Sequence, residues 1–173
     1  MREDSTTEPI NSPVVFNPQP EEMRPDNAYP TILSLQEDDY CVFTAKMPAG
    51  VVVPLHSQPD RETFHILSGE MNLYDGTSWR ILKQGDCVDV LSSTKHAWRN
   101  ASSFSATMLA ETTVRMGVFL QRVSNLANTS RDVQEALAQK EYFFKLVQEY
   151  GYWLGSPEDN EAIGLSTNWH RAT

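Results

Sequence analysis

The sequence predicts an all-β domain, a sandwich or barrel of short antiparallel strands, followed by helices. Between residues 31 and 120, eight or more short runs are rich in β-branched, aromatic or alternating apolar residues. Turn sequences such as SGE, YDGTS, KQGD and SSTK separate these runs. No strand–helix–strand alternation interrupts them, so the pattern is typical of antiparallel sandwiches and barrels rather than of a parallel sheet.

The first segment, residues 1–30, is predicted to be a proline-rich N-terminal arm. Proline lacks the backbone N–H that a central strand needs, so this segment cannot supply one. We expect it to run extended against the body from about Val14, with a possible short edge strand at residues 14–16. The prolines of the arm are Pro9, Pro13, Pro18, Pro20, Pro25 and Pro30.

The second segment, residues 31–122, is predicted to be the β-barrel. The Asp75-Gly76 pair predicts a β-hairpin within this segment, because these residues tolerate the positive φ of a tight β-turn. The strand-like runs are, in order, TILSLQ, YCVFTAKM, VVVPLH, ETFHIL, MNLY, WRIL, CVDVL, AWRN, SATMLAETT and RMGVFLQRV.

The third segment, residues 123–173, is predicted to be a C-terminal helical extension. A first helix is expected over TSRDVQEALAQKEYFFKLVQEYG, with Thr129 or Ser130 as cap, Asp132 in the first turn and Gly151 at its exit. A second, short helix is expected after Ser156 and Pro157. The apolar stripe of the first helix comprises Val133, Leu137, Phe144 and Val147, flanked by Phe143 and Tyr150.

Composition narrows the classes of partner and compartment. A chain of 173 residues with 40% hydrophobic and 21% charged residues is ordinary for one globular domain. Its net charge of −9, with no Lys/Arg-rich run, argues against nucleic acid or an anionic membrane as a partner. The N-terminus lacks a signal-peptide core, so a cytoplasmic protein is expected. Cys41 and Cys87 are interpreted as small buried hydrophobes.

Polar side chains interrupt the strand-like stretch GVVVPLHSQPDRETFHILSG. His56 and Gln58 are two residues apart and therefore face the same side of a strand, and Glu62 returns on the next strand. If the sheet closes, His96 can join them. Two imidazoles and a carboxylate on one face form the facial triad of non-haem iron oxygenases, which leaves positions open for substrate or O2.

The spacing of these residues resembles both motifs of the cupin superfamily. The first motif, with every spacing kept, comprises Gly50, His56, Gln58, Glu62 and Gly69. The second motif comprises Gly85, Leu91, Ser93, His96 and Asn100, with Leu91 and Ser93 where the family has Pro and Gly. The resemblance covers about residues 31–120 and extends to small bacterial cupins similar to quercetin dioxygenases and polyketide cyclases.

The resemblance implies an antiparallel jelly-roll β-barrel that often dimerises, so a homodimer is expected. It also implies a divalent metal held by His56, Gln58, Glu62 and His96, with Fe2+ as the first choice and Mn2+, Ni2+ or Zn2+ as alternatives. Gln58 stands where the family has a second histidine. A glutamine oxygen is a weaker ligand than imidazole, so Gln58 could be a ligand or a hydrogen-bonding neighbour.

The sequence leaves three functional hypotheses open. In the first, a dioxygenase-type metalloenzyme acts on an apolar or aromatic small molecule, with Glu62 as a possible general base. In the second, a redox-neutral cyclase, isomerase or lyase uses the same ion. In the third, a non-catalytic cupin binds a small ligand, with or without metal, in a polar pocket. The predicted substrate-pocket residues are Phe64, Trp98 and Met108, which could equally be core. His65 is expected to face outward, and His170 to take no part.

Overall fold

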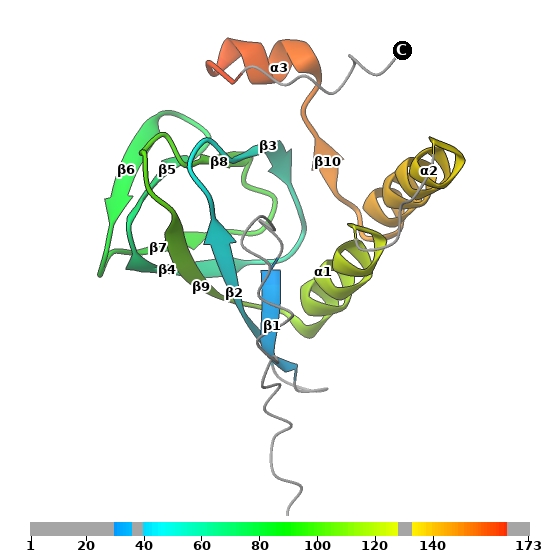
Figure 1. Ribbon diagram of the computed structural model, residues 1–173, viewed down its shortest axis with the longest axis horizontal. Helices are drawn as coiled ribbons and strands as arrows, with labels where there is room; N and C mark the ends of the chain where they lie inside the picture. The colour runs from blue at the N-terminus through cyan, green and yellow to red at the C-terminus, as the bar shows by residue number, and fades with distance from the viewer. Residues whose placement is uncertain (1–29, 36–39, 128–132, 166–173) are drawn as a thin grey trace, which may run out of the picture.

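The structure is a computed structural model that describes residues 30–35, 40–127 and 133–165 (Figure 1). Ten strands and three helices lie in these ranges. The strands are β1 (Pro30–Leu35), β2 (Cys41–Met47), β3 (Val52–Ser57), β4 (Glu62–Ser68), β5 (Glu70–Tyr74), β6 (Trp79–Lys83), β7 (Cys87–Val90), β8 (His96–Arg99), β9 (Ala106–Thr112) and β10 (Trp153–Leu154). The helices are α1 (Val114–Ala127), α2 (Val133–Glu149) and α3 (Pro157–Ala162).

Two five-stranded antiparallel sheets form the body of the molecule. The first has the strand order β1-β2-β9-β4-β7, and the second has the order β10-β3-β8-β5-β6. In Figure 1 the strands form one compact unit, with α1 and α2 beside it and α3 across one end. The expected β-rich core of antiparallel strands is confirmed, and its two sheets are consistent with a jelly-roll.

Alternating side chains build the core between the sheets. Along β2 and β9 every second residue is buried, which is the period of a strand with one face on the interior. Register pairs Phe43 with Ala110 and Ala110 with Phe64, so large side chains flank a small one across three strands. Each fully buried large apolar side chain contributes about 1.5–3 kcal/mol of transfer free energy.

Gly69 shows why one turn requires glycine. Its φ is +76°, in the left-handed region, and a Cβ added there would lie 2.8 Å from the Ala106 Cα. Any side chain would therefore separate the β4–β5 turn from the start of β9. This glycine lets the two sheets meet closely at that end of the core.

The expected strand over RMGVFLQRV is wrong, because these residues lie in helix α1. Its apolar residues recur with helical spacing, which a short apolar run does not distinguish from a strand. Thr113 caps the helix, since its Oγ1 accepts from the Met116 N–H at 3.1 Å. Met116 and Phe119 then pack against Leu146 of α2 and Tyr150, which follows that helix.

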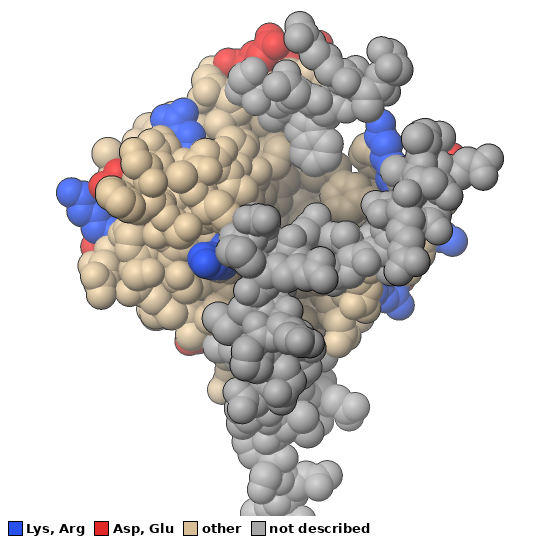
Figure 2. All heavy atoms as spheres, viewed as in Figure 1, with Lys and Arg blue, Asp and Glu red and all other residues tan. Residues whose placement is uncertain are grey.

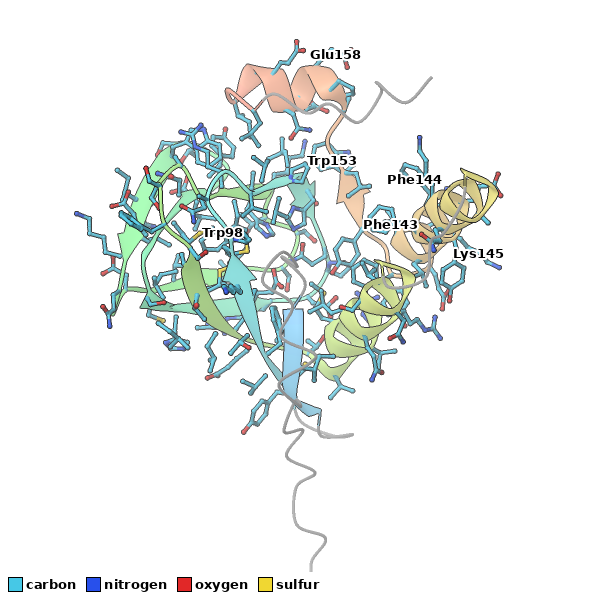
Figure 3. All side chains as sticks on the ribbon, viewed as in Figure 1. Trp98, Phe143, Phe144, Lys145, Trp153 and Glu158 are labelled. Atoms are coloured by element: carbon cyan, nitrogen blue, oxygen red, sulfur yellow. The ribbon has the colours of Figure 1, made fainter. Side chains whose placement is uncertain are left out.

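Helix α2 buries the expected face in part, since Val147 and Tyr150 are buried as predicted but Phe144 is not. Phe144 is 43% exposed, whereas Leu146 is 1% exposed and Val147 is buried. Figure 3 shows Lys145 on the other side of α2 from Phe143, and Phe143 packs against the cluster around Met116. The side chains of residues 133–137 and the predicted caps Thr129, Ser130 and Asp132 lie outside the described part of the chain.

Helix α3 begins as the sequence predicts. The Ser156 Oγ accepts from the Asp159 N–H, and the Asp159 carboxylate accepts from the Ser156 N–H, which forms a capping box with Pro157 in the first turn. The predicted arm, apart from Pro30 in β1, and His170 lie outside the described residues.

The surface carries no large cationic patch on the face drawn in Figure 2. Among the described residues drawn there, Lys and Arg side chains form separate small groups, most at the edge and one near the middle. No helix in the described ranges is long and apolar enough to cross a bilayer.

Candidate metal and ligand site

Two histidines from different motifs meet in the second sheet. β3 and β8 pair antiparallel with His56 opposite His96, after a register shift between Val53 and His56. The ring centroids are 4.2 Å apart, with 53° between the ring planes. The predicted juxtaposition of these imidazoles is therefore present in the fold.

Each of these imidazoles is oriented by its own strand. The Nδ1 atom of His56 lies 2.7 Å from the Pro54 carbonyl oxygen, and that of His96 lies 2.9 Å from the Thr94 carbonyl oxygen. A carbonyl oxygen only accepts, so Nδ1 carries the hydrogen and donates in both rings. Nε2 is then left with its lone pair, which is the tautomer that a metal-binding histidine needs.

The facing sheet supplies the carboxylate. Glu62 opens β4, and its Oε2 lies 3.6 Å from His96 Nε2. Gln58, which follows β3, donates its amide Nε2–H to the same oxygen at 2.5 Å. Glu62, Gln58 and His96 are 3%, 2% and 1% exposed. The site therefore lies in the interior, between the two sheets.

Electrostatics keeps His56 neutral. Desolvation by the surrounding protein and, to a smaller extent, the nearby His96 lower the pKa of His56 to about 3, although the hydrogen bond to the Pro54 carbonyl opposes the shift. At neutral pH this side chain is a lone-pair donor and not a cation. It suits an electrophile such as a metal ion better than an anion.

The donor set fits a divalent metal ion. Gln58 Oε1 and His96 Nε2 are buried and have no hydrogen-bond partner among the described residues. Imidazole nitrogens with carboxylate and amide oxygens suit Fe2+, Mn2+, Ni2+ and Zn2+. However, within the described ranges no group of three or more His, Cys, Asp or Glu side chains is already gathered around one point. The His56–His96 and His96–Glu62 pairs are formed, and the full convergence of the three stays a prediction.

Sequence reasoning missed Tyr152, which reaches the site from the C-terminal segment. β10 pairs with β3, with Leu154 opposite His56. The Tyr152 ring lies nearly parallel to His56, with 6.4 Å between centroids and 8° between planes, and it also stacks on Phe119 at 4.2 Å. Burial and the charges of Glu62 and Asp60 raise the pKa of the Tyr152 phenol. No local sequence signal marks this pairing.

The same segment fixes the backbone beside His56. The Leu55 N–H donates to Asn160 Oδ1 at 2.8 Å, and the Leu55 carbonyl accepts from the Gly155 N–H at 2.7 Å. Asn160 is 2% exposed. On the other side, the Lys95 ammonium lies 3.9 Å from the centroid of the Trp153 ring. The C-terminal segment thus contacts the chain next to both histidines.

The altered second motif still forms a tight turn. Ser93 adopts φ 63°, the left-handed conformation that glycine would take without cost. Its N–H donates to the Gln58 carbonyl oxygen at 2.7 Å, which ties the turn before His96 to the chain before Glu62. Leu91 is 60% exposed. The substitutions in this turn therefore leave His96 beside His56.

The three predicted pocket residues lie in the hydrophobic core. Phe64, Trp98 and Met108 belong to one buried cluster, and the Phe64 and Trp98 rings meet edge to face at 4.8 Å. Figure 3 shows Trp98 inside the barrel. Whether these side chains also contact a substrate stays a prediction.

The remaining predictions have mixed outcomes. His65 faces outward, 41% exposed, with its Nε2 3.8 Å from Glu111 Oε1. Cys41 is buried, but Cys87 is exposed, so the interpretation of both cysteines as buried hydrophobes is wrong for Cys87. The backbone register explains the difference, because Cys87 pairs with the outward-facing His65.

The family comparison identifies a domain. Residues 43–110 match the Cupin_2 family, described as a cupin domain. No curated protein matches the sequence. This match covers both histidines and Glu62, and it leaves out the C-terminal segment that carries Tyr152.

Similar solved structures overlap only part of this chain. The Schizosaccharomyces pombe Cnp3 cupin domain is 16% identical with a TM-score of 0.47, over 49% of this chain and 59% of that one. The DMSP lyase DddQ from Ruegeria pomeroyi DSS-3 is 31% identical with a TM-score of 0.42, over 44% of this chain and 39% of that one. The Streptomyces resistomycificus polyketide cyclase RemF is 13% identical with a TM-score of 0.42, over 43% and 54%. The family match carries the assignment: residues 43–110 of this chain form a cupin domain.

Proposed function

We propose that this protein is a cupin metalloenzyme that acts on an apolar or aromatic small molecule, with dioxygenase-type oxidation as the first candidate reaction. The observation that carries the proposal is the pair of adjacent imidazoles, His56 and His96, each with Nδ1 bound to a backbone carbonyl. The buried and unpartnered His96 Nε2 supports it, because such an atom is costly unless something binds it.

His56, Glu62 and His96 would hold the ion, with the Gln58 Oε1 as a further donor. When bound, a divalent ion would supply Lewis acidity at an enol or phenol oxygen and an open position for O2. The protein would orient the imidazoles through Pro54 and Thr94, and the buried surroundings would exclude water from the reacting groups.

A redox-neutral reaction is the second candidate, as in a cyclase, isomerase or lyase. It is favoured by the Gln58 amide, which donates to Glu62 and so orients this carboxylate as a proton acceptor. A non-catalytic role in binding a small ligand is the third candidate. It is favoured by the lack of a ready three-ligand group among the described residues.

Metal content is the deciding measurement. We expect protein purified after supplementation with Fe2+, Mn2+, Ni2+ or Zn2+ to retain about one ion per chain by elemental analysis. His96→Ala should weaken affinity at least about 100-fold, because it removes a direct ligand. His65→Ala is the matched control, since this imidazole is on the outer face and its loss should leave affinity unchanged. Equal retention by wild type and His96→Ala would refute the proposed site.

Oxygen use separates the first two candidates. A dioxygenase should give an electron paramagnetic resonance signal when nitric oxide is added to the Fe2+-loaded protein, and it should consume O2 with substrate. Metal binding without O2 consumption supports the redox-neutral reaction. No metal retention after supplementation supports the ligand-binding role.

A further inference from the structure

Trp98 presents a buried hydrogen-bond donor that the described protein does not use. Its side chain is 2% exposed, and its Nε1 has no hydrogen-bond partner among the described residues. Indole N–H groups usually find an acceptor when buried, because an unmade hydrogen bond carries the full cost of desolvation. The orphaned donor therefore points to an acceptor that the chain itself does not provide.

The position of Trp98 relates this donor to the candidate site. Trp98 follows His96 by two residues in β8, so both side chains enter the interior from the same face of the sheet. Within the described ranges, His96 Nε2 and Gln58 Oε1 there also lack a hydrogen-bond partner. These two atoms bear lone pairs and suit a cation, whereas Trp98 Nε1–H suits only an acceptor.

The surroundings of Trp98 are apolar. Its register partners are Val53 on one side and Leu73 on the other, and its ring meets Phe64 edge to face at 4.8 Å. Trp79 provides the contrast, since its Nε1–H donates to the Ile163 carbonyl oxygen at 2.7 Å. The protein thus satisfies one indole near the surface and leaves the buried one free.

We infer that the Trp98 indole N–H recognises an oxygen acceptor on the small molecule that this cupin binds. The inference rests on the proposed function and narrows its substrate class. The ligand would combine an apolar portion, which packs in the interior near Phe64, with a carboxylate, phenolate or enolate oxygen that accepts from Trp98. A purely hydrocarbon or cationic ligand would leave the donor unmet.

Indole resonances give a direct test on the full-length protein. In 1H–15N spectra, Trp98→Phe assigns the Trp98 signal and Trp79→Phe assigns the Trp79 signal. Benzoate, an aromatic carboxylate, is titrated into Zn2+-treated wild type, and benzylammonium, which has no acceptor, is the matched probe. We expect benzoate to shift the Trp98 indole proton downfield and slow its exchange, while Trp79 is unmoved.

The benzoate affinities of the two Phe variants give a second test. Trp98→Phe should weaken benzoate binding about tenfold, in line with the loss of one hydrogen bond to a charged acceptor, and Trp79→Phe should not weaken it. Three results would each overturn the inference: no shift of the Trp98 signal, equal benzoate affinity in Trp98→Phe and wild type, or an exchange-protected Trp98 N–H bound to an ordered water in the free protein.

A separate measurement distinguishes failure of the proposed metal site from failure of the inference about Trp98. Zn2+ binding is followed on the ring signals of His56 and His96 before benzoate is added. If Zn2+ leaves these signals unchanged, the metal site fails. The benzoate titration on the metal-free protein then still decides the role of Trp98.

Discussion

Two buried carboxylates lie two residues apart, and the protein treats them differently. Asp60 is 5% exposed and accepts from Thr113 Oγ1 at 2.5 Å and from Arg115 Nη2 at 2.7 Å. Arg115 in turn donates to the Tyr150 carbonyl oxygen at 3.0 Å. Asp60 therefore joins the barrel to the start of α1 and the end of α2, with its acceptors in use.

Glu62 is equally buried, but polar atoms beside it lack hydrogen-bond partners among the described residues. It accepts from Gln58 and lies 3.6 Å from His96 Nε2, yet neither Gln58 Oε1 nor His96 Nε2 has a hydrogen-bond partner among the described residues. The comparison teaches that burial of a charge does not by itself indicate function. The unused lone pairs around Glu62 distinguish a site that can bind something from a structural ion pair.

The isosteric pair Asp60→Asn and Glu62→Gln tests this contrast most strongly. Asp60→Asn should lower the free energy of unfolding by about 2–3 kcal/mol, because it removes the partner of Arg115, and Arg115 is partly exposed, which limits the cost. Glu62→Gln should change stability by less than about 1 kcal/mol and abolish metal retention. Urea unfolding and elemental analysis check both. The reverse pattern would exchange the two roles.

Tyr152 sharpens the contrast between Asp60 and Glu62, because the charges of both carboxylates act on its phenol. Tyr152→Leu should weaken Zn2+ affinity about tenfold, since the ring beside His56 is lost, and Tyr152→Phe should restore it. Calorimetric titration measures the affinity, and the 15N shift of the His56 ring reports its tautomer. If the leucine variant binds like wild type with an unchanged ring signal, Tyr152 does not position His56.

Cys41 supplies a buried ionisable group without a charged partner. Burial raises its pKa from the ordinary 9.0 to about 11. Its neutral form is favoured in the folded state, so the contribution to stability is complete below pH 9 and is lost as the pH rises toward 11. At pH 10 we expect a loss of about 1 kcal/mol relative to pH 8. Urea unfolding of wild type should show this loss and Cys41→Ala should lack it, whereas equal pH dependence would contradict the assignment.

Gln58→His is expected to have the smallest effect. Imidazole binds transition metals more tightly than an amide oxygen, so Zn2+ affinity should rise a few-fold if Gln58 is a ligand. Competition with a chelator measures the change. Unchanged affinity would instead leave Gln58 as the hydrogen-bond donor that orients Glu62.

The sequence was sufficient to predict that His56 and His96 lie side by side, because the strand period and the two motifs together put them on facing positions, and the register confirms this pairing. The convergence of Gln58 and Glu62 with these histidines around one ion stays a prediction. Local pattern could not reveal that β10 pairs with β3, because a two-residue strand has no periodicity and its partner is distant in sequence. For the same reason Tyr152 and Asn160 were missed.

Helical segments were harder to predict in detail. The run RMGVFLQRV has enough apolar residues for a strand, but it forms α1, which Thr113 caps and which packs against α2. Phe144 was placed on the buried stripe because a helical period alone does not say which neighbour covers which face. The homodimer, the cytoplasmic location and the identity of the metal stay predictions.

The pairing of β10 with β3 has a consequence for biosynthesis. The strand that bears His56 acquires its edge partner only when residues 153 and 154 have left the ribosome, long after both histidines have emerged. A nascent chain that has just completed the family-matched region would have β3 paired with β8 on one side and still without β10 on the other.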